Sequence, residues 1–155
     1  KVELFFDVHR AGMAINLNSI KPLANSSDGA VERLRAMCSA HIDNMLSSFS
    51  YQRVVMQGVE MHLYSATTPM QRKELELLMK EREYYEGLFR KVLTDGKEEG
   101  VFEFDNPSFA SKAVLALLNN PVLWYDPKRN KSDKSRLEIV EQFTGFALKT
   151  VLKKN

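Results

Sequence analysis

The sequence predicts an all-α fold, an antiparallel bundle of about six helices that forms one domain over residues 1–155. Apolar residues recur at three- and four-residue spacing along most of the chain, which is typical of amphipathic helices. No stretch alternates apolar and polar residues as a strand does, and residues that cap or stop helices separate the periodic stretches. Since 155 residues suffice to bury a sizeable core, one helical domain accounts for the whole chain.

The composition, with 44% apolar and 27% charged residues, is ordinary for a globular protein. A net charge of +2 is too small to indicate a nucleic-acid or membrane surface. The single Cys38 excludes an intrachain disulfide framework and fits a reducing compartment, so we expect a cytoplasmic protein. No apolar run approaches the roughly 18 residues that span a bilayer, and the opening KVELFFDVHR is too charged for a secretory signal. The chain begins at Lys1 without Met, which suggests a fragment.

The first predicted helix covers residues 2–20, where apolar residues form a loose helical stripe. Lys21-Pro22 and the NSSDG segment are expected to end it. Asp28 is the predicted N-cap of the second helix, whose apolar face repeats close to every 3.6 residues. That face consists of Val31, Leu34, Cys38, His41, Ile42, Met45, Leu46 and Phe49.

A shorter segment rich in Val and Met follows over residues 51–63. Thr68 is predicted to cap a long helix over residues 69–95, with Pro69 at its first position. This helix has two apolar stripes, which is typical of a helix packed between others. Gly96 is expected to end it in the left-handed conformation.

Two glycines stand four residues apart in the stretch KVLTDGKEEGVF, which could be a phosphate-binding loop, a GxxxG packing motif or a helix end. A phosphate loop needs a preceding strand and a GK[ST] element, but here a helix precedes and Lys97 is followed by Glu98. A membrane GxxxG motif needs an apolar stretch of about 20 residues, which is absent. We interpret the stretch as a helix end.

The last two predicted helices cover residues 107–125 and 133–152. Asn106 and Pro107 are the cap and first residue of the former, and Pro121 should kink or loosen it. Ser135 with Glu138 fits a capping box for the latter, with Ser132 or Asp133 as competing caps. Surplus apolar residues on these helices indicate a partner chain.

No residue pattern indicates catalysis. The three histidines lack metal-ligand spacing, and no nucleophile elbow, catalytic triad order or HExxH motif occurs. We therefore expect no enzyme activity, no metal and no cofactor.

The sequence instead offers candidates for a ligand pocket. His41 lies inside an apolar stripe, so it is either a core histidine bonded to a backbone carbonyl or a polar group that orients a ligand in a cavity. Arg82, in the buried stripe of the long helix, needs a partner, which could be a nearby Glu or an anionic ligand group. Trp124 and Tyr125 are either core residues or aromatic anchors at a subunit interface. Several methionines suit either a pocket for flexible apolar ligands or core filling; these are Met37, Met45, Met56 and Met61.

Four stretches, in this order and spacing, resemble bacterial TetR-family transcriptional regulators, in the region that binds ligand and dimerises. They are KVELFFDVHRAG, REYYEGLFRKVLTDGKEEGVF, NPSFASKAVLALLNNPVLWYDP and SRLEIVEQFTGFALKTVL. The resemblance covers nearly the whole chain and implies a C-terminal domain of that family. It departs from the family pattern at Asn120-Pro121.

The resemblance implies a homodimer formed through the last two helices and a cavity among the middle helices. Residues 1–20 would link this cavity to a helix-turn-helix head that is missing before Lys1. Operator DNA would be bound only through that head, and no membrane is involved. The function implied is a repressor released from DNA by an apolar or amphipathic molecule. The alternative is a helical protein-interaction adaptor or small-ligand carrier without a DNA-binding role.

Helix periodicity and the family architecture together predict two sets of site residues. The predicted ligand-binding residues are Met13, His41, Met45, Met56, Tyr85 and Asn119. The predicted dimer-interface residues are Leu118, Trp124, Phe143, Phe146 and Ala147.

Overall fold

The computed structural model describes residues 2–63, 68–130 and 132–154, and confirms the all-α prediction. Within these ranges the chain forms six α-helices and one short 3-10 helix. In the same described part, strand pairing is limited to one isolated antiparallel bridge between Phe102 and Leu152. None of the helices described is long and apolar enough to cross a membrane.

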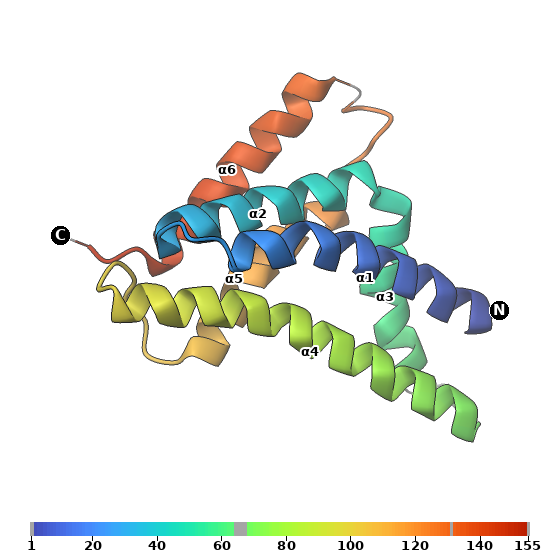
Figure 1. Cartoon of the computed structure of the whole chain (residues 1–155). Coiled ribbons are helices and arrows are strands. Elements are labelled where there is room, and N and C mark those ends of the chain that lie inside the picture. The colour runs from blue at the N-terminus through green and yellow to red at the C-terminus, as the bar shows by residue number, and fades with distance from the viewer. Residues whose placement is uncertain (1, 64–67, 131, 155) are drawn as a thin grey trace.

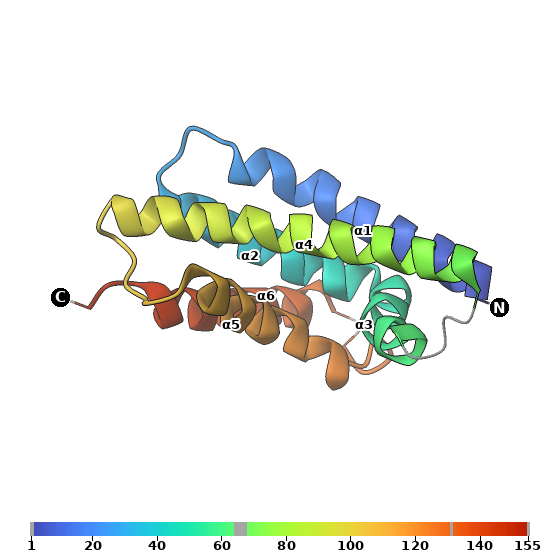
Figure 2. The same ribbon diagram turned by 90° about the horizontal axis from the view of Figure 1, so that it is seen from below.

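Helix α2 (Ala30–Ser47) lies at the centre of the bundle and contacts every other α-helix. On one side it packs against α1 (Val2–Ala24) and α4 (Pro69–Glu98), which run lengthwise beside it (Figure 1). On the other side it packs against α5 (Pro107–Asn119) and α6 (Asp133–Val151) (Figure 2). Helix α3 (Phe49–Leu63) crosses near the start of α1. The main core therefore surrounds α2.

The junction between α1 and α2 differs from the prediction at two points. Helix α1 passes through Pro22 and ends at Ala24, because a proline in the last turn removes only one backbone donor while Ala24 gains full burial. The N-cap of α2 is Gly29 rather than Asp28, and no side chain caps it locally. Instead, the backbone N–H of Ala30 donates to the Glu99 carboxylate at the far end of α4, over 3.1 Å.

Helix α4 begins as predicted and ends later than predicted. The Thr68 hydroxyl accepts from the Gln71 backbone N–H, with Pro69 at the first position. Gly96 is not a left-handed cap: it is helical and buried, and Gly100, with φ of 75°, takes the left-handed conformation instead. Gly96 is needed for space, since a Cβ there would lie 2.1 Å from the ring of Phe102.

Helix α5 has its predicted cap but is shorter than predicted, and α6 is capped by Ser132, one of the competing caps, rather than by a capping box of Ser135 with Glu138. Asn106 caps α5, which ends at Asn119, and a 3-10 turn follows from Asn120 to Leu123. Pro121 accounts for this change, because it cannot donate the next helical hydrogen bond. Ser132 is the cap of α6, accepting from the backbone N–H of Ser135.

Candidate functional site

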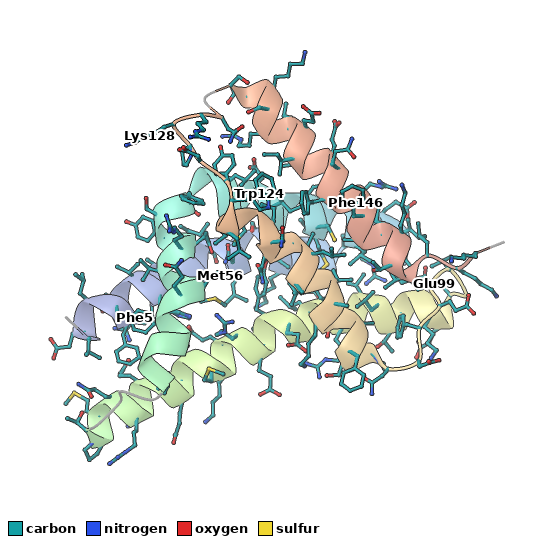
Figure 3. The ribbon with its side chains drawn as sticks, turned by 180° about the vertical axis from the view of Figure 1, so that it is seen from behind. Phe5, Met56, Glu99, Trp124, Lys128 and Phe146 are labelled. Carbon is teal, nitrogen blue, oxygen red and sulfur yellow. The ribbon has the colours of Figure 1, made fainter. Side chains whose placement is uncertain are left out.

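A cavity of about 720 Å³ lies among α1, α2, α3, α4 and α5. Met56, labelled in Figure 3, lies on the side of α3 that faces α5. The apolar part of its wall consists of Met13, Met45, Val55, Met56, Met79, Leu115 and Ala116. The polar part consists of Asn16, Gln52, Ser108, Asn119, His41 and Tyr85, together with six charged residues discussed below. The wall thus combines an apolar part with convergent polar and charged groups, a lining that suits an amphipathic small molecule.

All six predicted ligand-binding residues line this one cavity. Met13 comes from α1, His41 and Met45 from α2, Met56 from α3, Tyr85 from α4 and Asn119 from the end of α5. The structure thus brings together residues from five helices. That they bind a ligand remains a prediction.

His41 is held between two side chains, and among the described residues it makes no bond to a backbone carbonyl, the first of the two alternatives. Its Nε2 lies 2.8 Å from Asn119 Oδ1, and its Nδ1 lies 2.6 Å from the Tyr85 hydroxyl. An amide oxygen only accepts, so Nε2–H donates to Asn119 and Nδ1 accepts from Tyr85 O–H. The neutral imidazole therefore has a defined tautomer. The amide nitrogen of Asn119 makes no other hydrogen bond in the described part of the chain and is free to donate.

Burial keeps both members of the His41–Tyr85 pair uncharged near neutral pH. Desolvation lowers the pKa of His41 to about 4, against a smaller opposing effect of its hydrogen bond to Asn119. Desolvation also raises the pKa of Tyr85 well above its ordinary value. The pair can therefore orient a polar group of a ligand without carrying charge.

Asn16 of α1 and Gln52 of α3 form a second buried polar pair that sequence reasoning missed. Asn16 Nδ2 donates to Gln52 Oε1 over 3.1 Å, and Gln52 Nε2 donates to Asn16 Oδ1 over 3.0 Å. Both side chains line the cavity. The signal available was a polar residue within an apolar helical stripe, since Asn16 stands between Met13 and Ile20 at helical spacing.

The six charged residues on the cavity wall are Lys80, Arg82, Glu83, Glu86, Arg90 and Lys112. Glu86 is engaged by three partners: Lys112 Nζ at 2.8 Å, Arg90 Nη2 at 3.7 Å and the donating Ser111 hydroxyl at 3.1 Å. The prediction for Arg82 allowed a nearby Glu, but none pairs with it among the residues described. Desolvation lowers the pKa of Arg82.

His9 of α1 lies one helical turn before Met13 and is fully buried. Neither of its ring nitrogens has a hydrogen-bond partner among the described residues. Burial, and then the positive charges of Arg82 and Arg10, lower the pKa of His9 to about 4. This histidine is therefore neutral and lies within electrostatic range of Arg82.

The predicted dimer-interface residues divide into two groups. Trp124 and Phe146, half-exposed at 50% and 45%, flank Phe143, whose ring centroid lies 5.9 Å from that of Trp124 and 5.7 Å from that of Phe146 (Figure 3). Leu118 and Ala147 are instead fully buried in the core of the single chain, so they expose no surface to a partner. Helical periodicity showed that both residues lie on apolar faces of their helices but could not show that the chain's own core covers them.

Trp124 and Tyr125, which the sequence left open between core and interface, have opposite environments. Tyr125 is buried and packs edge-on against Phe49, with ring centroids 5.5 Å apart. Trp124 is turned outward, and its indole N–H donates to Asn120 Oδ1. Only Trp124 is therefore available as an anchor.

Residues 27–151 match the C-terminal domain of tetracyclin repressor-like proteins. Among solved structures, the TetR-family regulator PfmR from Thermus thermophilus is 20% identical, with a TM-score of 0.77 over 96% of this chain and 75% of that chain. A tetR-family regulatory protein from Rhodococcus RHA1 is 16% identical, with a TM-score of 0.81 over 99% of this chain and 75% of that chain. The ketosteroid regulator KstR2 of Mycobacterium tuberculosis is 17% identical, with a TM-score of 0.79 over 98% and 73%. No curated protein matches the chain.

Proposed function

Because this chain belongs to the TetR family of transcriptional regulators, of which it contains the C-terminal domain, we propose that its cavity senses an apolar or amphipathic effector and that the effector releases the protein from DNA. The family is one of regulators and not of enzymes, and the resemblance predicted from the sequence is confirmed. The observation that carries the proposal is the cavity itself: methionine-rich, about 720 Å³, with a neutral His41–Tyr85–Asn119 network on its wall.

The position of α1 supports coupling between the cavity and DNA. Met13 and Asn16 of α1 line the cavity, and the same helix continues without a break toward the N-terminal end of the chain. An effector that binds one placement of α1 better than another shifts the population toward that placement. In our proposal, a helix-turn-helix head joined to the start of α1 moves with that helix. The two heads of a dimer then leave the spacing of about 34 Å that binding to successive major grooves requires.

A solved relative of this fold supports the effector class. AibR, described in complex with isovaleryl coenzyme A and operator DNA, is 16% identical with a TM-score of 0.73 over 94% of this chain and 73% of that chain. That complex supports an acyl compound as a ligand class for this architecture. We carry over only the class of ligand, an apolar chain with a polar group.

We further propose that the protein is a cytoplasmic homodimer that pairs through α5 and α6. The half-exposed Trp124 and Phe146 support this, since aromatic side chains are enriched at the centres of protein interfaces. Two further exposed apolar residues lie in the same part of the chain: Leu123 in the turn after α5, and Leu137 in α6.

The test is binding of the neutral apolar fluorophore N-phenyl-1-naphthylamine to the intact protein, followed by an operator-binding assay with an effector found by displacing it. We expect one saturable site per chain, and effectors that displace the dye should weaken operator binding. Absence of saturable dye binding would refute the sensor function and favour a helical adaptor. Dye displacement without any effect on operator binding would favour a carrier.

A further inference from the structure

We propose that the effector is an anionic amphiphile whose negatively charged group pairs with Arg82 while its apolar part lies against the methionines of the cavity. This inference rests on the proposed sensor function and specifies the ligand class of the same site. The first supporting fact is that Arg82 lines the cavity without a partner. In the part of the chain that the structure describes, its guanidinium makes no hydrogen bond and no ion pair.

Arg33 is a buried arginine of this protein, and its charge is fully paired. Its guanidinium lies 2.8 Å from an Asp95 carboxylate oxygen and 3.6 Å from Glu99, and it donates to two backbone carbonyl groups. A partly desolvated arginine is costly unless such partners exist. Arg82 is partly buried, which lowers its pKa, but it lacks the partners that Arg33 has. An anion in the cavity would supply them.

The other charged side chains of the wall do not, on balance, repel an anion bound at Arg82. Four cationic residues and two carboxylates line the cavity, so the wall has a positive excess. Glu86 is already engaged by Lys112 and Arg90. Glu83 follows Arg82 directly in sequence, but consecutive residues of a helix point in different directions, and no ion pair joins them. Arg82 is therefore the cation on this wall that is both partly buried and unpaired within the described ranges.

The neighbours of Arg82 define the rest of the ligand. Tyr85 is three residues further along α4, so its Cβ lies about 5–6 Å from that of Arg82 on the same face. Beyond Tyr85, the free amide N–H groups of Asn119 can donate to a carbonyl or hydroxyl oxygen, because His41 occupies the amide oxygen. Met13, Met45 and other apolar side chains supply the apolar part of the wall. Both a fatty carboxylate and an acyl thioester of a phosphorylated carrier have this chemistry.

Two dyes that differ by a single charged group test the inference in the intact protein. They are N-phenyl-1-naphthylamine, which is neutral, and 8-anilinonaphthalene-1-sulfonate, which adds a sulfonate to the same aromatic skeleton. We expect the wild type to bind the sulfonate about tenfold more tightly than the neutral dye. Arg82→Gln should weaken sulfonate binding about tenfold to a hundredfold, the usual effect of losing a charge-assisted hydrogen bond, and leave the neutral dye within about twofold.

Arg72→Gln is the matched control, because Arg72 is an exposed arginine of the same helix that does not line the cavity. It removes the same charge and should change neither affinity. Should Arg82→Gln fail to fold, Arg82→Lys keeps the charge, and we expect it to retain most of the preference for the sulfonate. Displacement of the sulfonate by decanoate or by decanoyl coenzyme A then identifies the source of the charge.

The outcomes separate this inference from the sensor function. If the neutral dye binds but Arg82→Gln leaves sulfonate binding unchanged, or weakens both dyes equally, the charge recognition is refuted and the sensor function stands. If neither dye binds the wild type, both proposals fail. Failure of both decanoate and decanoyl coenzyme A to displace the sulfonate would refute the amphiphile class.

Discussion

Gly96→Ala is the sharpest test of how the structure is packed. A methyl group at this position would lie 2.1 Å and 2.4 Å from two carbon atoms of the Phe102 ring. The ring cannot swing away easily, because Phe102 is 3% exposed and its backbone N–H donates to Gly96 O over 3.0 Å. The bridge to Leu152 holds the same residue from the other side. Relief of the clash therefore requires movement of the loop or of the end of α4.

The expected magnitude follows from two opposing terms. Overpacking against a fixed ring costs about 3 kcal/mol, and replacing glycine by alanine within a helix returns about 1 kcal/mol. The net loss is about 2 kcal/mol in the free energy of unfolding, or about 4–8 °C in Tm for a chain of this size. Urea denaturation followed by far-UV circular dichroism measures the former, and a thermal melt the latter.

Gly87→Ala is the matched control, since Gly87 lies in the same helix and no described residue lies within 4 Å of the position its Cβ would take. The same substitution there should raise the free energy of unfolding by up to about 1 kcal/mol, through helix propensity alone. Opposite signs for the two variants would support the packing described. A Gly96→Ala protein as stable as the Gly87→Ala protein would show that Phe102 does not pack on Gly96.

Three further predictions concern the polar network, the pH dependence and the interface. Tyr85→Phe leaves Nδ1 of His41 without its donor and should lower the free energy of unfolding by about 1–3 kcal/mol in urea denaturation; no change would mean that the bond is absent. Because the folded pKa values of His9 and His41 are lowered from 6.5 to about 4, the unfolded chain takes up protons first, so stability should be complete above about pH 6.5 and fall as pH drops toward 4. A urea midpoint that stays flat from pH 7 to 5 would contradict this. Phe146→Glu should convert a dimer to a monomer in light scattering at micromolar concentration, whereas Met70→Glu, at an exposed apolar residue elsewhere on the chain, should not; a monomeric wild type would refute the dimer itself.

The sequence by itself determined the features that depend on residues close together in the chain. The caps at Thr68 and Asn106 were predictable, because each side chain accepts from a backbone N–H only two or three residues away. The disturbance at Pro121 was predictable for the same reason, as the missing donor is a property of the residue. Helical spacing also placed His41 and Tyr85 on inward faces.

Tertiary structure alone decided the features that depend on distant partners. Ala30 donates its N–H to the carboxylate of Glu99, 69 residues away in sequence, rather than being capped by the neighbouring Asp28. Asn16 and Gln52 meet across 36 residues, and Gly96 is glycine because Phe102 folds back over it. Helical periodicity shows which face of a helix is apolar but not what covers that face. For that reason it could not separate Leu118 and Ala147, which the core buries, from Trp124 and Phe146, which remain exposed.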